Sequence, residues 1–170
     1  KMPPAFKKDG VTTAANASGI NDGASAALVM SKDKANELGL KPLMKLIYIC
    51  TEGIDPLVMG LGPAVAIPKC LQKANMQFAD VDYWEINEAF ASQWLGVGRM
   101  LDRDFGIKLD LDKVNHNGSG IALGHPVGST GLRIIVSMYY EMERLGLKTG
   151  GASLCVGGGP AMASLWTREI

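Results

Sequence analysis

The sequence lacks the features that mark several large functional classes. It contains 17 Lys and Arg against 17 Asp and Glu, so its formal net charge is zero, and no cationic cluster stands out. Because nucleic-acid binding relies on a concentrated basic surface, nucleic acid is not an expected partner. No apolar stretch approaches the roughly 20 residues that span a bilayer, and no signal-peptide pattern opens the chain. These absences predict a soluble protein with no membrane partner.

Cysteine and histidine are both scarce. The three cysteines, Cys50, Cys70 and Cys155, follow no pairing rhythm. This pattern predicts reduced thiols and a cytoplasmic location, with Cys50 and Cys70 as packing residues. The two histidines, His116 and His125, have no cluster of further ligands near them in the sequence. We therefore expect neither a metal nor a resident cofactor.

A single α/β domain accounts for the length and for the order of patterns along the chain. At 170 residues the chain can enclose one hydrophobic core. Apolar runs typical of strands alternate with helical patterns, which favours a mixed five-stranded sheet covered by helices. The expected strands cover 24–30, 43–50, 81–86, 152–156 and 161–166, and the expected helices begin near Ser31, Pro63, Asn87 and Thr130. The last two strands, joined by a glycine turn, should form a hairpin.

The run from Asn115 to Gly131 is rich in glycine around a histidine. Glycine allows positive φ angles and lets a ligand approach the backbone, so this run suits the wall of a reaction site. His125 stands in a Gly-His-Pro turn, where Pro126 restricts the bend from which the ring projects. The helix that follows is apolar on nearly every side and is expected to be buried. An imidazole there can polarise a carbonyl or assist proton transfer, and a purely structural histidine is the alternative.

Cys155 lies near the end of the apolar run 152–156, and three glycines follow that run. A glycine turn after a strand leaves backbone N–H groups unobstructed, so these donors can hold a developing oxyanion. A thiol at this place could act as a nucleophile or as an acid and base. A buried cysteine with a packing role is the alternative.

Two further segments allow two interpretations each. Asn87 follows the expected strand 81–86 and precedes Glu88. That pattern suits a helix cap, but the amide could instead hold a water at the carboxyl end of a strand. The segment 16–24 is small, polar and rich in glycine, so it could be a turn or could contact an extended ligand. The residues alone do not choose between these interpretations.

Five motifs follow one another in an informative order. They are Asn-Ala-Ser-Gly-Ile-Asn-Asp-Gly-Ala at 16–24, Asp-Pro-Leu-Val-Met-Gly-Leu-Gly-Pro at 55–63, Asn-Glu-Ala-Phe-Ala at 87–91, Gly-His-Pro at 124–126 and Cys-Val-Gly-Gly-Gly at 155–159. Together they resemble the thiolase family, and in particular the C-terminal half of acetyl-CoA acetyltransferases and 3-ketoacyl-CoA thiolases. The resemblance implies that residues 1–170 form a thiolase-like C-terminal domain.

The resemblance also implies a role for each matching residue. Asn87 matches an asparagine that holds a catalytic water, and His125 matches the histidine that shares an oxyanion hole with that water. His125 also matches the residue that helps to generate the thiolate of a separate nucleophilic cysteine. Cys155 matches the cysteine that acts as acid and base, and the Gly157 N–H matches a donor of a second oxyanion hole.

Substrate contacts are implied in the same way. Ser18 matches a serine that bonds the pantetheine arm of coenzyme A. Met59 and Phe90 match residues of the acyl pocket, although both would also suit an ordinary core. The family implies acetyl-CoA or acyl-CoA as substrate, and a homo-oligomer.

The family's nucleophilic cysteine has no counterpart in this sequence, because the family carries it in an N-terminal half. We therefore expect an acetyl-CoA C-acetyltransferase domain that is inactive without that half. The motif at 55–60 favours the biosynthetic, short-chain type, and the degradative type stays open. A non-catalytic module that binds coenzyme A or dimerises with a partner chain is the alternative function.

Overall fold

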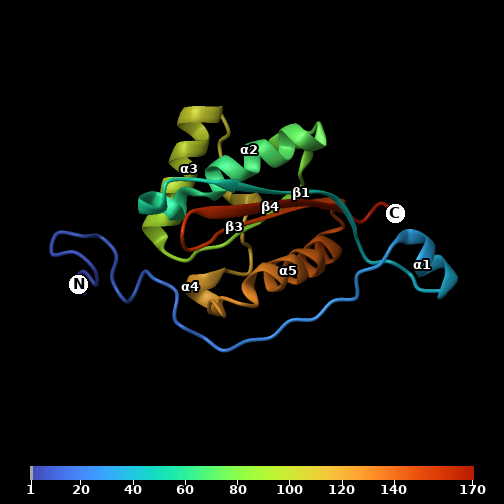
Figure 1. The fold of residues 1–170 in the computed structure, drawn as a ribbon, viewed down its shortest axis with the longest axis horizontal. Helices are drawn as coiled ribbons and strands as arrows, with labels where there is room; N and C mark the ends of the chain where they lie inside the picture. The colour runs from blue at the N-terminus through green and yellow to red at the C-terminus, as the bar shows by residue number, and fades with distance from the viewer. Residues whose placement is uncertain (1) are drawn as a thin grey trace.

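The computed structural model describes residues 2–170, so Lys1, the first residue of the expected domain, lies outside the described part. Its strands form one sheet in the order β1-β4-β3-β2 (Figure 1). They are β1 (Lys45–Gly53), β2 (Tyr83–Ile86), β3 (Thr149–Cys155) and β4 (Pro160–Thr167). β4 pairs antiparallel with β1 and β3, whereas β2 pairs parallel with β3. The mixed sheet and the β3–β4 hairpin are confirmed, but the expectation of five strands is wrong, because residues 2–170 form a four-stranded sheet.

The strand expected at 24–30 is the one that does not form. These residues pair with no strand of the described chain, and the side chains of Leu28 and Val29 are largely exposed. Figure 1 shows the segment passing below α5 (Thr130–Leu145) on its way to α1 (Lys32–Glu37), with the helix between it and the sheet in this view. A strand needs partners for its N–H and C=O groups, and the apolar pattern alone does not supply them.

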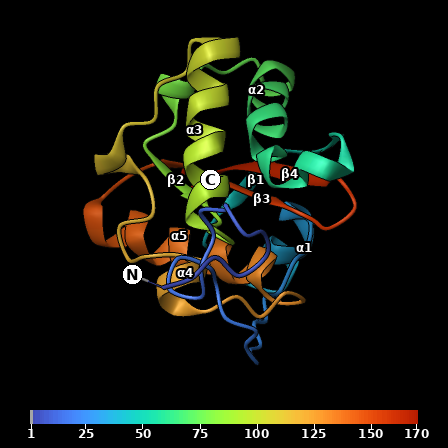
Figure 2. The ribbon, with the colours of Figure 1, turned by 90° about the vertical axis from the view of Figure 1, so that its left-hand side faces the viewer.

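Helices cover both faces of the sheet. α2 (Pro63–Ala74) and α3 (Ala91–Phe105) lie above it, and α5 lies below it (Figures 1 and 2). α2 packs on β1 and β4, while α5 packs on β2 and β3. The shorter helical segments are η1 (Pro56–Leu61), η2 (Phe78–Asp80), η3 (Leu111–Lys113) and α4 (Gly120–Leu123). Within residues 2–170, no helix combines the length and apolar character needed to cross a bilayer.

Two of the expected helices differ from those observed. α3 begins at Ala91 with Phe90 at its N-cap position, so of the two interpretations of Asn87 the helix cap is wrong. The backbone from Ala89 to Ala91 instead bonds to Asn16 and Ser18, which holds it extended. α5 was expected to be buried on nearly every side, yet its buried residues lie on one face and Tyr140 is 61% exposed.

β2 is fully buried and distributes its side chains between two cores. Trp84 and Ile86 belong to the cluster between the sheet and helices α2 and α3. Tyr83 belongs to the cluster between the sheet and α5. Because side chains alternate along a strand, Glu85 shares the α5 side with Tyr83. The Tyr83 hydroxyl donates a 2.7 Å hydrogen bond to Glu85 Oε1. β2 therefore presents polar groups to α5 inside an otherwise apolar core.

Cys50 and Cys70 are structural residues of the first core. Cys70 is buried on α2, and its Sγ donates to the Ala163 carbonyl at 3.4 Å. Cys50 Sγ donates to the Ala66 carbonyl at the same distance. Burial raises the pKa of both thiols, that of Cys70 to about 12. Both side chains pack as the sequence predicted.

Candidate active site

Asn87 and Cys155 lie at one edge of the sheet. Asn87 directly follows β2, Cys155 is the last residue of β3, and these two strands run parallel. The Asn87 N–H donates to the Ser153 carbonyl at 3.0 Å, only two residues before Cys155. Carboxyl ends of adjacent parallel strands are a common place for ligand sites, because loops diverge there.

Asn87 offers a polar group that its surroundings do not use. The residue is fully buried, and its Oδ1 accepts a long hydrogen bond of 3.5 Å from Ser119 Oγ. Its Nδ2 is buried without a hydrogen-bond partner among residues 2–170. Leaving a buried donor unpaired costs about 1–3 kcal/mol, so an amide kept in this way is a candidate for binding an external group.

Asn115 fixes the backbone around Asn87. Its Oδ1 accepts from the Ile86 N–H at 2.9 Å, and its Nδ2 donates to the Ile86 carbonyl and to Glu88 Oε1, each at 2.8 Å. Asn115 has a φ of 52°, a left-handed conformation that asparagine tolerates well. These bonds terminate β2 and hold Asn87 in place without a helix cap.

His125 projects from the bend that the sequence predicted. Its N–H donates to Asn21 Oδ1 at 2.9 Å, and its Nδ1 lies 2.7 Å from Thr130 Oγ1. The Thr130 hydroxyl donates to the Pro126 carbonyl at 3.0 Å, so it must accept the bond from the histidine. In the neutral ring the proton is therefore on Nδ1. Nε2 carries the lone pair.

The environment of His125 favours this neutral form. Burial of the half-buried ring lowers its pKa, and the charge of Arg133 lowers it further. At neutral pH the imidazole is uncharged, and Nε2 is able to accept a proton. The geometry thus suits a base rather than a permanent cation.

Cys155 ends β3, and the glycine turn after it leads into β4. The thiol is 9% exposed, and burial raises its pKa, so it is protonated at neutral pH. Gly158 and Gly159 have φ angles of 94° and 108°, which turn the chain into β4. Gly157 is exposed and has open space where a side chain would stand. The Pro160 carbonyl closes the turn by accepting from the Val156 N–H at 2.8 Å.

Ser18 and Phe90 are adjacent through a backbone bridge. Ala17 pairs with Phe90, and the Ser18 N–H donates to the Ala89 carbonyl at 2.8 Å. Ile20 forms a second bridge with His125. The segment 16–20 therefore joins the loop after β2 to the histidine turn, which brings Ser18 beside this site.

Met59 is the remaining residue that the sequence predicted for the acyl pocket. It lies on η1, half-buried, and η1 packs against α3 where Gly60 contacts Gln93. The turn after Cys155 also reaches this region, because the Ile54 N–H donates to the Gly159 carbonyl at 3.0 Å. Met59 is thus connected to the glycine turn, although no direct contact joins it to Cys155 or His125 among the bonds described.

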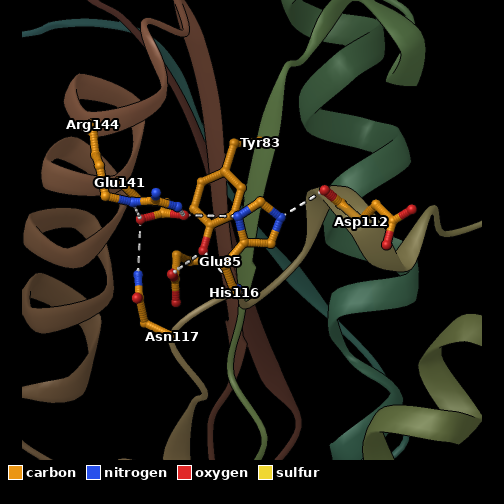
Figure 3. A network of polar contacts seen from close by, with 7 residues as sticks. All are labelled: Tyr83, Glu85, Asp112, His116, Asn117, Glu141 and Arg144. Atoms are coloured by element: carbon orange, nitrogen blue, oxygen red, sulfur yellow. Dashed lines mark hydrogen bonds and ion pairs between the residues drawn. The ribbon is translucent and has the colours of Figure 1, made fainter.

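His116 belongs to a separate polar network (Figure 3). Its Nδ1 lies 2.8 Å from Glu141 Oε1 and its Nε2 lies 2.6 Å from the Asp112 carbonyl. Both ring nitrogens face acceptors, so the ring is an imidazolium, and its pKa is raised by Glu141 despite partial burial. Arg144 is the main cause that lowers the pKa of Glu141 to about 2. His116 is therefore a charged structural residue, opposite in character to His125.

The sequence did not identify four residues of the site region as part of the site: Thr130, Ser119, Asn115 and Arg133. Thr130 orients the histidine, and Ser119 and Asn115 hold the loop around Asn87. Arg133 carried the one available signal, because it is a single cation within the otherwise apolar stretch 131–136. Ser119 and Asn115 differ little from ordinary turn residues, since polar bonds between distant segments leave no local pattern, and Thr130 has the sequence of an ordinary helix start.

The family model for the thiolase C-terminal domain matches residues 40–168 of the chain. The chain belongs to the thiolase family. The model for the thiolase N-terminal domain matches residues 1–33. The segment 24–30, extended and unpaired here, falls within this second match, so its β-forming pattern belongs to the part of a thiolase that lies in the other domain.

Individual thiolases agree with this assignment. An acetyl-CoA acetyltransferase of Syntrophomonas wolfei is 53% identical over 163 residues, which cover 96% of this chain and 40% of the relative. A solved acetyl-CoA acetyltransferase structure from Syntrophomonas wolfei has a TM-score of 0.94 at 69% identity, and covers 100% of this chain and 43% of that one. The human mitochondrial 3-ketoacyl-CoA thiolase in complex with CoA gives a TM-score of 0.88 at 42% identity, covering 98% of this chain and 41% of that one. The chain thus spans about two fifths of the length of these relatives.

Proposed function

We propose that this chain is the C-terminal part of an acyl-CoA:acetyl-CoA C-acyltransferase that makes or cleaves acetoacetyl-CoA. One observation carries the proposal: a buried unpaired amide and a buried protonated thiol stand at the ends of the parallel strands β2 and β3, and the segment 16–20 joins the loop after β2 to a neutral imidazole. Forming a carbon nucleophile from a thioester requires charge stabilisation at oxygen and a nearby base. Asn87, His125 and Cys155 supply these functions.

Cys155 is proposed as the acid and base at carbon. In thiolysis its S–H proton goes to the carbon of the departing enolate, which leaves a thiolate on Cys155. In synthesis the thiolate removes a proton from the acetyl methyl group and becomes S–H again. Because burial raises the pKa of this thiol, its thiolate is a stronger base than an exposed cysteine would be.

His125 and Asn87 are proposed to act at oxygen. The nucleophilic thiol of a thiolase N-terminal half would give its proton to His125 Nε2, which leaves a thiolate able to accept the acyl group. Nε2–H then donates a hydrogen bond to the enolate oxygen, together with a water held by Asn87 Nδ2. The Gly157 N–H is proposed to bond the oxygen of the acyl-enzyme thioester.

Coenzyme A contacts follow from the position of the segment 16–20. Ser18 lies beside the loop after β2, and its hydroxyl is proposed to bond the pantetheine arm. Met59 and Phe90 are proposed to line the acyl pocket, since η1 and the start of α3 flank the same edge. The human relative solved in complex with CoA supports coenzyme A as the ligand class.

A chimera tests the proposal. It joins residues 1–170 to the preceding part of the Syntrophomonas wolfei acetyl-CoA acetyltransferase of known structure, which is 69% identical over the shared region. The chimera should cleave acetoacetyl-CoA when coenzyme A is added, measured by the loss of the enolate absorbance, and the 170-residue chain alone should not. A folded chimera that binds coenzyme A but never turns over would contradict the catalytic proposal and favour a binding module.

A further inference from the structure

His116 joins three elements of the fold at one place. Its Nδ1 lies 2.8 Å from Glu141 Oε1 on α5, and its Nε2 lies 2.6 Å from the Asp112 carbonyl in η3, so the imidazole stands between them (Figure 3). Its backbone N–H donates at 3.1 Å to the hydroxyl of Tyr83 on β2, and the two ring centroids are 4.8 Å apart. The next residue, Asn117, donates to Glu141 Oε2 at 3.2 Å. The loop around His116 is therefore fastened to α5, β2 and η3.

The two bonds of the His116 ring require a proton on each nitrogen. A backbone carbonyl can only accept, so Nε2 carries a proton toward Asp112. Arg144 donates to both oxygens of Glu141, at 2.9 and 2.7 Å, which keeps this carboxyl ionised although only 2% of its side chain is exposed. An Nδ1 lone pair would face that carboxylate, so Nδ1 carries a proton as well. The ring binds both partners only as an imidazolium.

Residues on either side of His116 hold the end of β2 and Asn87. Asn115 accepts from the N–H of Ile86 and donates to its carbonyl, and Ile86 directly precedes Asn87. Three residues after His116, Ser119 Oγ donates to Asn87 Oδ1 at 3.5 Å. The segment 115–119 thus contacts Asn87 from both of its ends, while His116 in its middle is held by α5 and η3.

We infer that His116 is a positioning residue of the candidate site: its bonds to Glu141 and to the Asp112 carbonyl clamp the segment 115–119, and this clamp keeps Asn87 in place. The inference rests on the proposed function in giving Asn87 a role at the enolate oxygen. The clamp itself does not depend on turnover. It is observable in the 170-residue chain.

The clamp should loosen at alkaline pH. A neutral imidazole turns one lone pair toward an acceptor, so one of the two bonds is lost. Burial alone would lower the pKa of His116, but the bonds to Glu141 and to Asp112 raise it above the ordinary value of about 6.5. A group whose pKa is raised in the fold stabilises it fully below the ordinary pKa. This contribution is then lost as the pH rises through the raised value.

One neighbouring group can also change its charge near neutral pH. The charged and titratable side chains around His116 belong to the elements that it joins: Glu141 and Arg144 of α5, Asp112 and Lys113 of η3, and Tyr83 and Glu85 of β2. Burial raises the pKa of Glu85 to about 7. Glu85→Gln controls for this carboxyl, because a glutamine oxygen can still accept from Tyr83.

Hydrogen exchange in the 170-residue chain, followed by NMR, tests the clamp. The Ile86 N–H donates to Asn115 Oδ1, whereas the next N–H, that of Asn87, donates to the Ser153 carbonyl of β3. These amides are neighbours, but only the first depends on the segment that His116 holds. At about pH 6, His116→Gln should speed exchange of the Ile86 amide about tenfold or more, and that of Asn87 less than about twofold.

The pH dependence of the Ile86 amide gives a second measurement. In the wild type its protection relative to Asn87 should fall as the pH rises through the pKa of His116, and in His116→Gln it should be low at every pH. Arg144 opposes the proton on His116, so Arg144→Gln should move the fall to higher pH. Glu85→Gln should leave the fall in place.

Two results would overturn the inference. One is an Ile86 amide in the wild type whose protection relative to Asn87 does not change with pH, a result that needs no variant to fold. The other is equal exchange in the wild type and His116→Gln, or a parallel rise at Ile86 and Asn87, which would mean that the whole strand opens.

The chimera separates this inference from the proposed function. At about pH 6, His116→Gln should lower kcat for thiolysis about fivefold or more with little change in KM, because Asn87 is proposed to act at the enolate oxygen. The ratio of wild-type to variant rates should approach one at alkaline pH, where both lack the clamp. If the chimera is inactive but the Ile86 amide behaves as described, the proposed function fails and the clamp stands. If the chimera is active and this ratio does not change with pH, His116 has only a structural role and the inference fails.

Discussion

We expect replacement of Cys155 by alanine to lower acetoacetyl-CoA thiolysis by the chimera about a thousandfold. Proton transfer by a positioned side chain contributes typically 10²–10⁴-fold to a rate, and Cys155 is the proposed donor at carbon. The loss should appear in kcat with little change in KM, because the thiol acts on the reacting carbon rather than on the coenzyme A arm. Steady-state kinetics of the purified variant measure both quantities.

Cys50→Ala provides the matched control for this variant. Cys50 is a second cysteine in the chain, half-buried in β1 on the core beneath α2, and the mechanism assigns it no role. Its replacement should change the rate less than threefold. If Cys155→Ala kept more than a tenth of the wild-type rate, or lost no more than Cys50→Ala, Cys155 would not be the acid and base.

Replacement of Gly151 by alanine should destabilise the fold by about 3 kcal/mol or more. A Cβ at this position would overlap the ring of Trp84, which is fully buried. Trp84 is stacked on Phe78 with ring centroids 5.1 Å apart, so the indole has no room to move away. Overpacking of a rigid core typically costs 1–3 kcal/mol, and sometimes more. Urea unfolding of the 170-residue chain measures the change.

Two glycines of the same sheet calibrate this result. Gly150→Ala would press on the sulfurs of Met138 and Met142, which are flexible side chains, so we expect a smaller loss. Gly53→Ala at the end of β1 faces open space and should change stability by less than about 0.5 kcal/mol. Equal losses for Gly151→Ala and Gly53→Ala would show that the packing of Trp84 against β3 is not as described.

The sequence predicted the elements whose neighbours are close in the chain. The helix expected to begin near Pro63 is α2, and the hairpin around Gly157 to Gly159 joins β3 to β4. Both follow from local chemistry, since proline favours a helix start and glycine permits the turn. Ser31 likewise caps α1 by accepting from the Lys34 N–H at 3.2 Å.

The errors arose where distant segments determine the conformation. Residues 24–30 have a strand pattern, but within residues 2–170 they pair with no strand of the sheet. Asn87 resembles a helix cap, yet Asn115 and the segment 16–18 hold the following residues extended. Propensity and capping patterns are weak guides when hydrogen bonds from another part of the chain compete.

Sequence identified the candidate reacting groups better than the residues that control them. His125, Asn87 and Cys155 stand in short motifs with unusual glycine content. The bonds of Ser119 to Asn87 and of Asn115 to Ile86 join segments about 30 residues apart in the chain. No local pattern reports such a tertiary contact.

The most direct test of the central claim is whether Asn87, His125 and Cys155 together generate an enolate. Acetyl-CoA incubated with the chimera in deuterated water should incorporate deuterium into its methyl group, followed by the loss of the methyl proton signal. Cys155→Ala and Asn87→Ala should reduce this exchange to near the rate in buffer. If the active chimera exchanged these protons equally fast with either replacement, the enolate would form elsewhere, and the account of this site would be wrong.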